Sequence, residues 1–189
     1  MDNMDNKEKV LIEIYADGVY FPKPRLGGIA SLILFPDGTT MNLSRGYENT
    51  DTLRMKITSV ISSLDGAAQL IEKKIIKPGT YINLLTDSES VVNCITRGWL
   101  RAWQSNGWFL TTTGKPVKNA VLLEELSSFI HRIEKSGVKL DFTCIAGIGT
   151  PIFFNPCVLD AEKTLYYYKG CNKLAVEAFR RLEKSLLKS

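Results

Sequence analysis

Two acids stand at the ends of apolar, strand-like segments. Asp17 closes IEIYAD and Asp87 closes INLLTD. A carboxylate near the end of a central strand is costly to bury without a partner of opposite charge. Carboxylate oxygens are also the ligands that magnesium prefers in proteins. A simpler role exists for Asp87, because Ser88 and a helical pattern follow it and an acid there can cap a helix.

A lysine and an amide are the next residues whose types bear on chemistry. Lys56 lies in TLRMKIT and Asn172 lies in KGCNKLAVEA. A charged lysine has no lone pair to offer a metal ion. Its ammonium could instead pair with carboxylates that the fold brings next to it. The alternative is that Lys56 extends its charged end into solvent.

Residues 97–118 combine cations with large aromatic side chains and contain no acid. The segment holds Arg97, Trp99, Arg101, Trp103, Trp108, Lys115 and Lys118. Flat rings interleaved with positive charge are typical of nucleic-acid surfaces. Trp99 and Trp103 are four residues apart, however, and on a helix they would share one face against a core. Taken alone, this spacing favours packing.

Length and composition indicate one globular domain. The chain has 189 residues, of which 44% are hydrophobic and 23% charged, with a net charge of +4. This is enough for one core, so we expect a domain over residues 10–189 after a flexible stretch at 1–9. The four cysteines form no CxxC pair and there is one histidine, which favours buried free thiols over zinc. No leader or membrane span is recognisable, and we expect an intracellular, cytoplasmic protein.

The periodicity of apolar residues predicts an ordered series of elements. The turn at 36–38 predicts that the first three strands form an antiparallel meander. A helical stripe then crosses over to a further strand. The predicted strands are 10–16, 27–35, 39–47, 81–86 and 138–145, and the predicted helices are 52–74, 88–97, 119–136 and 168–187, with residues 98–118 as a loop.

Several segments match the motifs of one nuclease family in order and spacing. They are IEIYADG, the pair Gly27 and Gly28, SRGYENTDTLRMK, LLTDSESVVNCIT, WLRAWQSNGW with GKPVKNAVLLEEL, and CNKLAVEA. Over about residues 10–180 the chain resembles type 1 ribonuclease H. The resemblance implies an α/β fold with a five-stranded mixed sheet, three antiparallel strands followed by two parallel strands, and helices on both faces.

The resemblance also implies where the family's four metal-binding acids should lie. The positions are Asp17, residue 56, Asp87 and residue 172, and in the family they hold two magnesium ions that activate water and stabilise the leaving oxygen. Here Lys56 and Asn172 replace two acids, so the cluster carries a net charge of −1 instead of −4. At this position the Lys56 ammonium could lie between Asp17 and Asp87 and hold the two acids in place. We therefore expect no cofactor, or magnesium at Asp17 and Asp87 if metal binding persists.

Other positions depart from the family in the same direction. The loop CIAGIGTPIFF lacks the family's histidine, and an apolar insertion at about 147–167 contains Phe153 and Phe154. This insertion could dock a protein partner or pack on its own domain. The positions that would meet RNA hydroxyls, a backbone phosphate and the substrate handle are also altered: Lys23, Thr52, Leu53, Glu89, Asp51, Gln104, Ser105 and Asn106.

Three hypotheses about function follow. The first is a pseudo-nuclease that has lost hybrid hydrolysis and acts as a protein-interaction or scaffold module within a nucleic-acid-processing complex. The second is a module that binds RNA/DNA hybrids through residues 97–118 without cutting them. The third is an active, magnesium-dependent RNA/DNA-hybrid endoribonuclease with rearranged metal ligands, for which Glu48, Glu89 and Glu177 are the available acids.

Overall fold

A computed structural model describes residues 10–146, 150–152 and 160–188 of the chain. All the strands in these residues belong to one sheet, in the order β3-β2-β1-β4-β5-β6. The strands are β1 (Leu11–Phe21), β2 (Leu26–Leu34), β3 (Thr40–Glu48), β4 (Tyr81–Thr86), β5 (Lys139–Ala146) and β6 (Thr150–Ile152). The helices are α1 (Thr52–Glu72), α2 (Glu89–Thr96), α3 (Trp99–Ser105), α4 (Ala120–Lys135) and α5 (Ala161–Leu186).

The sheet has the mixed arrangement that the sequence predicts. β1 and β2 pair antiparallel, as do β2 and β3. β4 pairs parallel with both β1 and β5, because α1 and the α2–α4 segment carry the chain back across the sheet. The five-stranded prediction is confirmed, and the short β6 adds a sixth strand antiparallel to β5.

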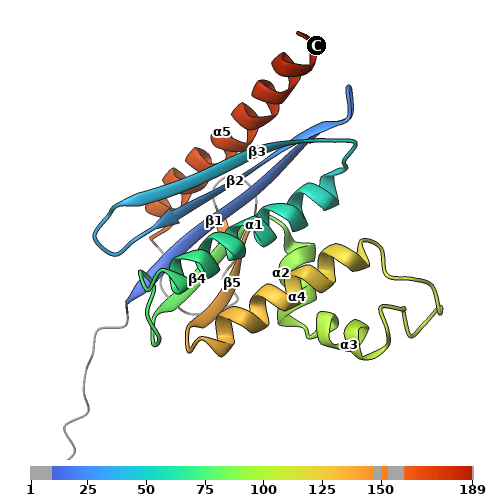
Figure 1. Ribbon diagram of the computed structural model, residues 1–189, viewed down its shortest axis with the longest axis horizontal. Helices are drawn as coiled ribbons and strands as arrows, with labels where there is room; N and C mark the ends of the chain where they lie inside the picture. The colour runs from blue at the N-terminus through green and yellow to red at the C-terminus, as the bar shows by residue number, and fades with distance from the viewer. Residues whose placement is uncertain (1–9, 147–149, 153–159, 189) are drawn as a thin grey trace, which may run out of the picture.

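Helices cover both faces of this sheet (Figure 1). α5 lies on one face, where Cys171 and Ala175 pack against Tyr15 and Leu32. α1 and α4 lie on the other face and enclose a larger apolar cluster. Every residue of β2 is buried, because the strand lies in the sheet interior beneath helices on both sides.

Two helical predictions were wrong. Trp99–Ser105 forms the short helix α3 where we expected a loop. α5 begins at Ala161 instead of about residue 168, so residues 161–167 of the predicted insertion are helical. The Asp160 side chain accepts hydrogen bonds from the backbone N–H groups of Glu162 and Lys163 at 3.0 and 3.1 Å, which starts the helix early.

Some predictions lie outside the described residues. These include the N-terminal stretch 1–9 and the part of the insertion that contains Phe153 and Phe154. Within the described ranges, none of the helices has the length and apolar character needed to cross a membrane.

Close packing of α5 on β2 depends on a residue without a side chain. A Cβ atom at Gly28 would lie 2.0 Å from the carbonyl oxygen of Ala175 and 2.8 Å from the amide nitrogen of Phe179. Both are backbone atoms of α5, so the whole helix would have to move away. The Gly27 and Gly28 pair of the sequence motif therefore has a packing role at its second position.

Gly28→Ala should lower the free energy of unfolding by about 2 kcal/mol or more, because overpacking at a backbone contact cannot relax locally. Gly66→Ala in α1 is the matched control. Its nearest neighbour would be Ile33 Cδ1 at 3.8 Å, and alanine favours the helix by up to about 1 kcal/mol. Denaturant unfolding of both variants measures the difference, and equal stabilities would contradict this account of the packing.

Candidate functional site

Four elements converge on the residues singled out from the sequence. Asp17 lies on β1 and Asp87 follows the last residue of β4. Tyr15 pairs with Leu85 in the parallel register, so extending that register by two residues brings Asp17 level with Asp87. Helices on opposite faces of the sheet then add their own side chains to this edge.

Lys56 and Asn172 are the side chains that these helices supply. Lys56 lies in the second turn of α1, and its Nζ donates to Asp17 Oδ1 at 2.7 Å. The same ammonium donates to both oxygens of Asp87, at 2.6 and 2.8 Å. Asn172, midway along α5, donates from Nδ2 to Asp17 Oδ2 at 2.6 Å. The structure therefore brings all four predicted residues together.

The buried Asp17 carboxylate finds its hydrogen-bond and charge partners within the cluster. The Asp17 side chain is 0% exposed, and both of its oxygens accept a hydrogen bond from a neighbouring side chain. Burial alone would lower the pKa of Lys56, but Asp17 and Asp87 outweigh it and raise that pKa above its ordinary value. Lys56 is therefore a charged donor that compensates a buried carboxylate, and it does not extend into solvent.

Two further residues of α5 belong to the site and were missed from the sequence. Tyr168 is one of them: burial, together with the charges of Asp17 and Asp87, raises the pKa of its phenol. Burial likewise raises the pKa of the Cys171 thiol, whose Sγ donates to the carbonyl of Tyr15 at 3.2 Å. Tyr168 stands four residues before Asn172 on the helix, and this spacing was the available signal.

The groups around Asp17 and Asp87 decide whether the cluster can hold the magnesium ions of the family. The groups directed at Asp17 and Asp87 are an ammonium and an amide N–H, both of which are hydrogen-bond donors. A divalent cation needs acceptor oxygens in those places. In the ranges that the structure describes, no group of three or more His, Cys, Asp or Glu side chains is arranged to hold a metal. The residues present do not fit a divalent cation.

The basic aromatic segment divides between core and surface. Trp103 and Trp108 pack against the main core; the helical spacing favoured such packing for Trp99 and Trp103, and of that pair only Trp103 is placed there. Trp99 is 39% exposed, and the Arg97 guanidinium lies over its ring at 5.7 Å from the centroid. Trp99 and Arg97 thus form a small cationic, aromatic surface, whereas the other two indoles have structural roles.

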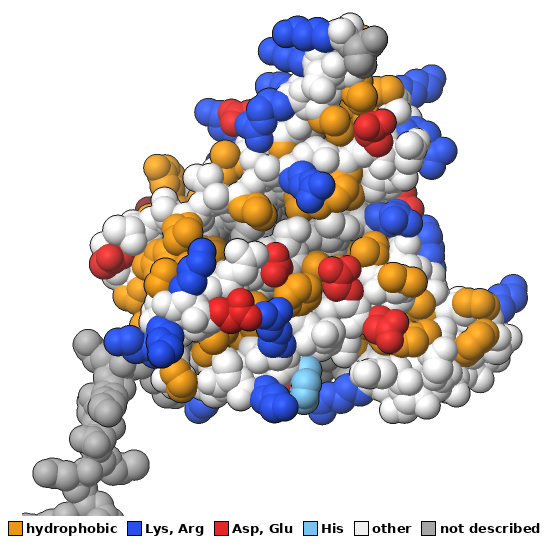
Figure 2. Space-filling model, in the orientation of Figure 1, with side chains coloured by type: hydrophobic (Ala, Val, Ile, Leu, Met, Phe, Trp, Pro, Cys, Tyr) orange, Lys and Arg blue, Asp and Glu red, His pale blue; other side chains and the backbone are white. Residues whose placement is uncertain are grey.

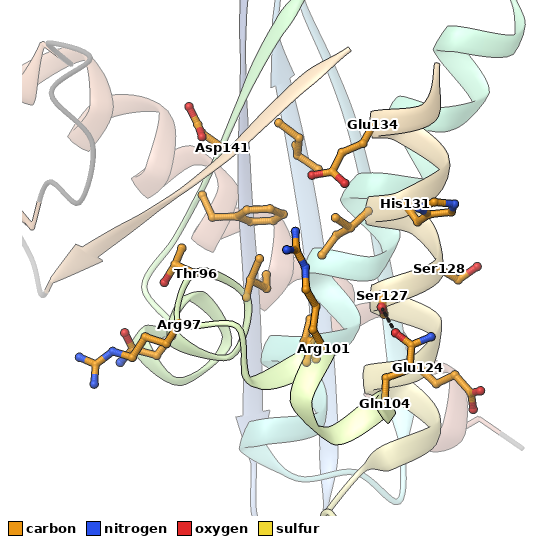
Figure 3. Close-up of a pocket in the computed structure, with 16 residues that line it drawn as sticks. Thr96, Arg97, Arg101, Gln104, Glu124, Ser127, Ser128, His131, Glu134 and Asp141 are labelled. Carbon is orange, nitrogen blue, oxygen red and sulfur yellow. Dashed lines mark hydrogen bonds between the residues drawn. The ribbon is translucent and has the colours of Figure 1, made fainter. Parts of the chain in front are cut away.

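The cations of this segment do not share one surface. Arg97 and Arg101 both line a cavity bounded by α4 and β5, and Figure 3 shows the Arg101 side chain extending along it while the Arg97 side chain extends in another direction. The cavity has a volume of about 1110 Å³. Lys115 and Lys118 are exposed, and Lys118 Nζ lies 3.8 Å from Asp51 Oδ2. Asp51 also caps α1 by accepting from the Arg54 amide at 2.9 Å, which gives it a local structural role.

Solved structures with the same arrangement identify the class of fold. LC9-RNase H1, described as a type 1 RNase H with the type 2 active-site motif, aligns with a TM-score of 0.61 and 20% identity, covering 90% of this chain and 72% of that chain. LC11-RNase H1, solved in complex with RNA/DNA hybrid, gives a TM-score of 0.57 and 20% identity, covering 90% of this chain and 98% of that chain. The chain has a ribonuclease H-like fold.

Sequence comparison supplies the family. The RNase H family model matches residues 8–142. A ribonuclease H of Thermoanaerobacter sp. (strain X514) is 37% identical over 130 residues, which is 69% of this chain and 77% of the relative. This protein belongs to the ribonuclease H family. Asp17, Lys56 and Asp87 lie inside the matched range, whereas α5 with Asn172 lies beyond it.

Lys56→Met should lower the free energy of unfolding by at least about 2 kcal/mol, because it leaves Asp17 buried without its cation. Lys118→Met is the control, since that pair is long and 72% exposed on the lysine side, and its loss should cost less than about 0.5 kcal/mol. The raised pKa of Lys56 means that its stabilisation is complete below its ordinary pKa of 10.5 and is lost as the pH rises above it.

Urea unfolding at several pH values measures both effects. The difference between the wild-type chain and Lys56→Met should be constant around neutral pH and shrink only above about pH 10.5. A difference no larger than that of the Lys118→Met control would contradict the role assigned to this lysine.

Proposed function

We propose that this chain is a pseudo-nuclease: a member of the ribonuclease H family that does not hydrolyse RNA/DNA hybrids and acts as a binding or scaffold module in nucleic-acid processing. The observation that carries the proposal is the Lys56 ammonium, within 2.8 Å of oxygens of both Asp17 and Asp87. It holds the place between the two acids that a bridging cation would need.

Simple electrostatics supports the loss of hydrolysis. Two-metal hydrolysis depends on carboxylates that hold two dications about 4 Å apart. Here a single ammonium and a neutral amide already satisfy the buried Asp17. A magnesium ion entering between the acids would have to displace Lys56 and then remain close to its charge. That repulsion disfavours metal binding at ordinary magnesium concentrations.

A competing proposal is an active enzyme with rearranged metal ligands, which is favoured by the names of the relatives. The Thermoanaerobacter relative is a ribonuclease H. In this version magnesium binds at Asp17 and Asp87 together with an acid that the family does not use. Lys56 would have to leave the cluster for this to occur, and the experiment below separates the two proposals.

The decisive experiment compares the wild-type chain with a double reversion, Lys56→Glu with Asn172→Asp. The wild type should leave an RNA/DNA hybrid intact in millimolar magnesium and show no heat of magnesium binding by calorimetry. The double variant should bind magnesium, and its melting temperature should rise with magnesium concentration because only the folded state holds the ion. Restored cleavage in the double variant would add direct support.

Lys118→Glu with Asn106→Asp serves as a matched control, because it makes the same charge changes away from the cluster. It should leave the response to magnesium unchanged. The proposal is wrong if the wild type cleaves the hybrid in magnesium and Asp87→Asn abolishes that cleavage. A wild-type chain that takes up magnesium with the loss of the Lys56 contacts would also reject it and favour the active enzyme.

A second candidate function is binding of RNA/DNA hybrids without cleavage, favoured by the Arg97 guanidinium over the exposed Trp99 ring. Cations beside an exposed aromatic ring suit a nucleic-acid backbone and its neighbouring bases. LC11-RNase H1, a fold neighbour, was solved with an RNA/DNA hybrid. The Arg101 side chain extends along the cavity, which makes it a weaker contributor to such a surface.

Hybrid binding should weaken steeply with salt, and Arg97→Glu should lower the affinity by about tenfold and reduce the salt dependence. Arg101→Glu should have a smaller effect, which makes it an internal control of orientation. Fluorescence anisotropy of a labelled hybrid across a salt series provides the measurement. An affinity that does not change with salt concentration, or equal losses of affinity in the two variants, would reject this surface.

A further inference from the structure

A line of cations runs along the outward face of α5. Its members follow one another at intervals of four, seven and four residues, which return to the same side of an α-helix. They are Lys169, Lys173, Arg180 and Lys184, and all are exposed. The opposite side of the helix packs on the sheet through Cys171 and Ala175. We call the four cations the α5 stripe.

The cations of the α5 stripe have no acidic partner among the described residues. Among the residues that the structure describes, no member of the α5 stripe forms an ion pair. Arg181, the neighbouring cation, differs, because it donates to Ser44 Oγ at 2.7 Å and so helps hold α5 on β3. The stripe is therefore free to meet a ligand.

The helix also concentrates the charge of the chain. α5 contains six Lys and Arg against three Glu, a surplus of three, whereas the whole chain has a net charge of +4. By helical geometry Glu177 and Glu183 fall on either side of the stripe, and both are partly buried. Figure 2 shows Lys and Arg side chains gathered around the C-terminal end of α5, which reaches the upper edge of the molecule in Figure 1.

We propose that the α5 stripe binds the phosphate backbone of duplex nucleic acid. Lys169 and Lys184 are fifteen residues apart, which at about 1.5 Å per residue gives a stripe about 22 Å long. Over that length a duplex carries on the order of a dozen phosphates, so a straight row of unpaired cations is complementary to it. The site is separate from the Arg97 and Trp99 surface. It also does not depend on whether the chain can cleave nucleic acid at Asp17 and Asp87.

A membrane surface suits this face less well. Helices that lie on membranes insert an apolar face between the lipids and keep their cations at its borders. The apolar face of α5 is already used against the sheet, where Cys171 and Ala175 are fully buried. The outward face of α5 therefore suits a ligand that presents a row of negative charges and no apolar surface.

The test uses the full chain and a labelled DNA duplex of about 20 base pairs, with affinity measured by anisotropy across a salt series. Arg180→Glu with Lys184→Glu should weaken binding by about tenfold or more and lower the salt slope by about 2. Lys73→Glu with Lys77→Glu, two exposed cations near the end of α1, reverses the same charge and should have little effect. Circular dichroism verifies that each variant is folded.

Arg180→Gln with Lys184→Gln provides a second, milder variant that keeps the helix and should weaken binding in the same direction. Unchanged duplex binding by the stripe variants overturns the proposal, as does an equal loss in the α1 control. Preferential binding to vesicles of anionic lipid or to an acidic protein, with no binding to the duplex, also overturns it. Because cleavage is not measured, failure here leaves the pseudo-nuclease proposal standing.

Discussion

The buried carboxylate of Asp17 on β1 is the constraint on which the rest of this site depends. Asp17 has no contact with water, and an isolated charge in that position would be strongly destabilising. The Lys56 ammonium and the Asn172 amide each satisfy one of its oxygens. Helices from both faces of the sheet thus contact the same side chain, and Lys56 also pairs with Asp87.

Much of this could be predicted from the sequence because the signals are local. Strand periodicity predicted the strands that carry Asp17 and lead to Asp87, although β1 continues to Phe21 and Asp17 lies within it instead of at its end. The resemblance to type 1 ribonuclease H put residue 56 beside the two acids, and charge then favoured a lysine paired with both of them, which the structure shows. The mixed five-stranded sheet followed from the order of the elements.

The missing parts depend on packing between distant segments. The early start of α5 rests on the Asp160 cap and on burial of Thr164, and a run of three tyrosines gave no helical signal of its own. Tyr168, by contrast, lies inside the predicted helix four residues before Asn172, so its place in the site could have been predicted from that spacing. The short helix α3 forms where Trp103 packs against the core. A segment of seven residues is too short for hydrophobic periodicity to predict a helix. The different directions of Arg97 and Arg101 likewise depend on tertiary placement.

The amide contact of Asn172 has a consequence for how this site can evolve. Asn172 and Lys56 approach different oxygens of one buried carboxylate, so the effect of changing either residue depends on the identity of the other. An acid at 172 alone would place a second negative charge against Asp17, while an acid at 56 alone would remove the one cation that contacts both aspartates. Each single step toward a metal site passes through a less stable chain. The effects of substitutions at positions 56 and 172 are therefore coupled, and the two positions have to change together for the cluster to regain four acids.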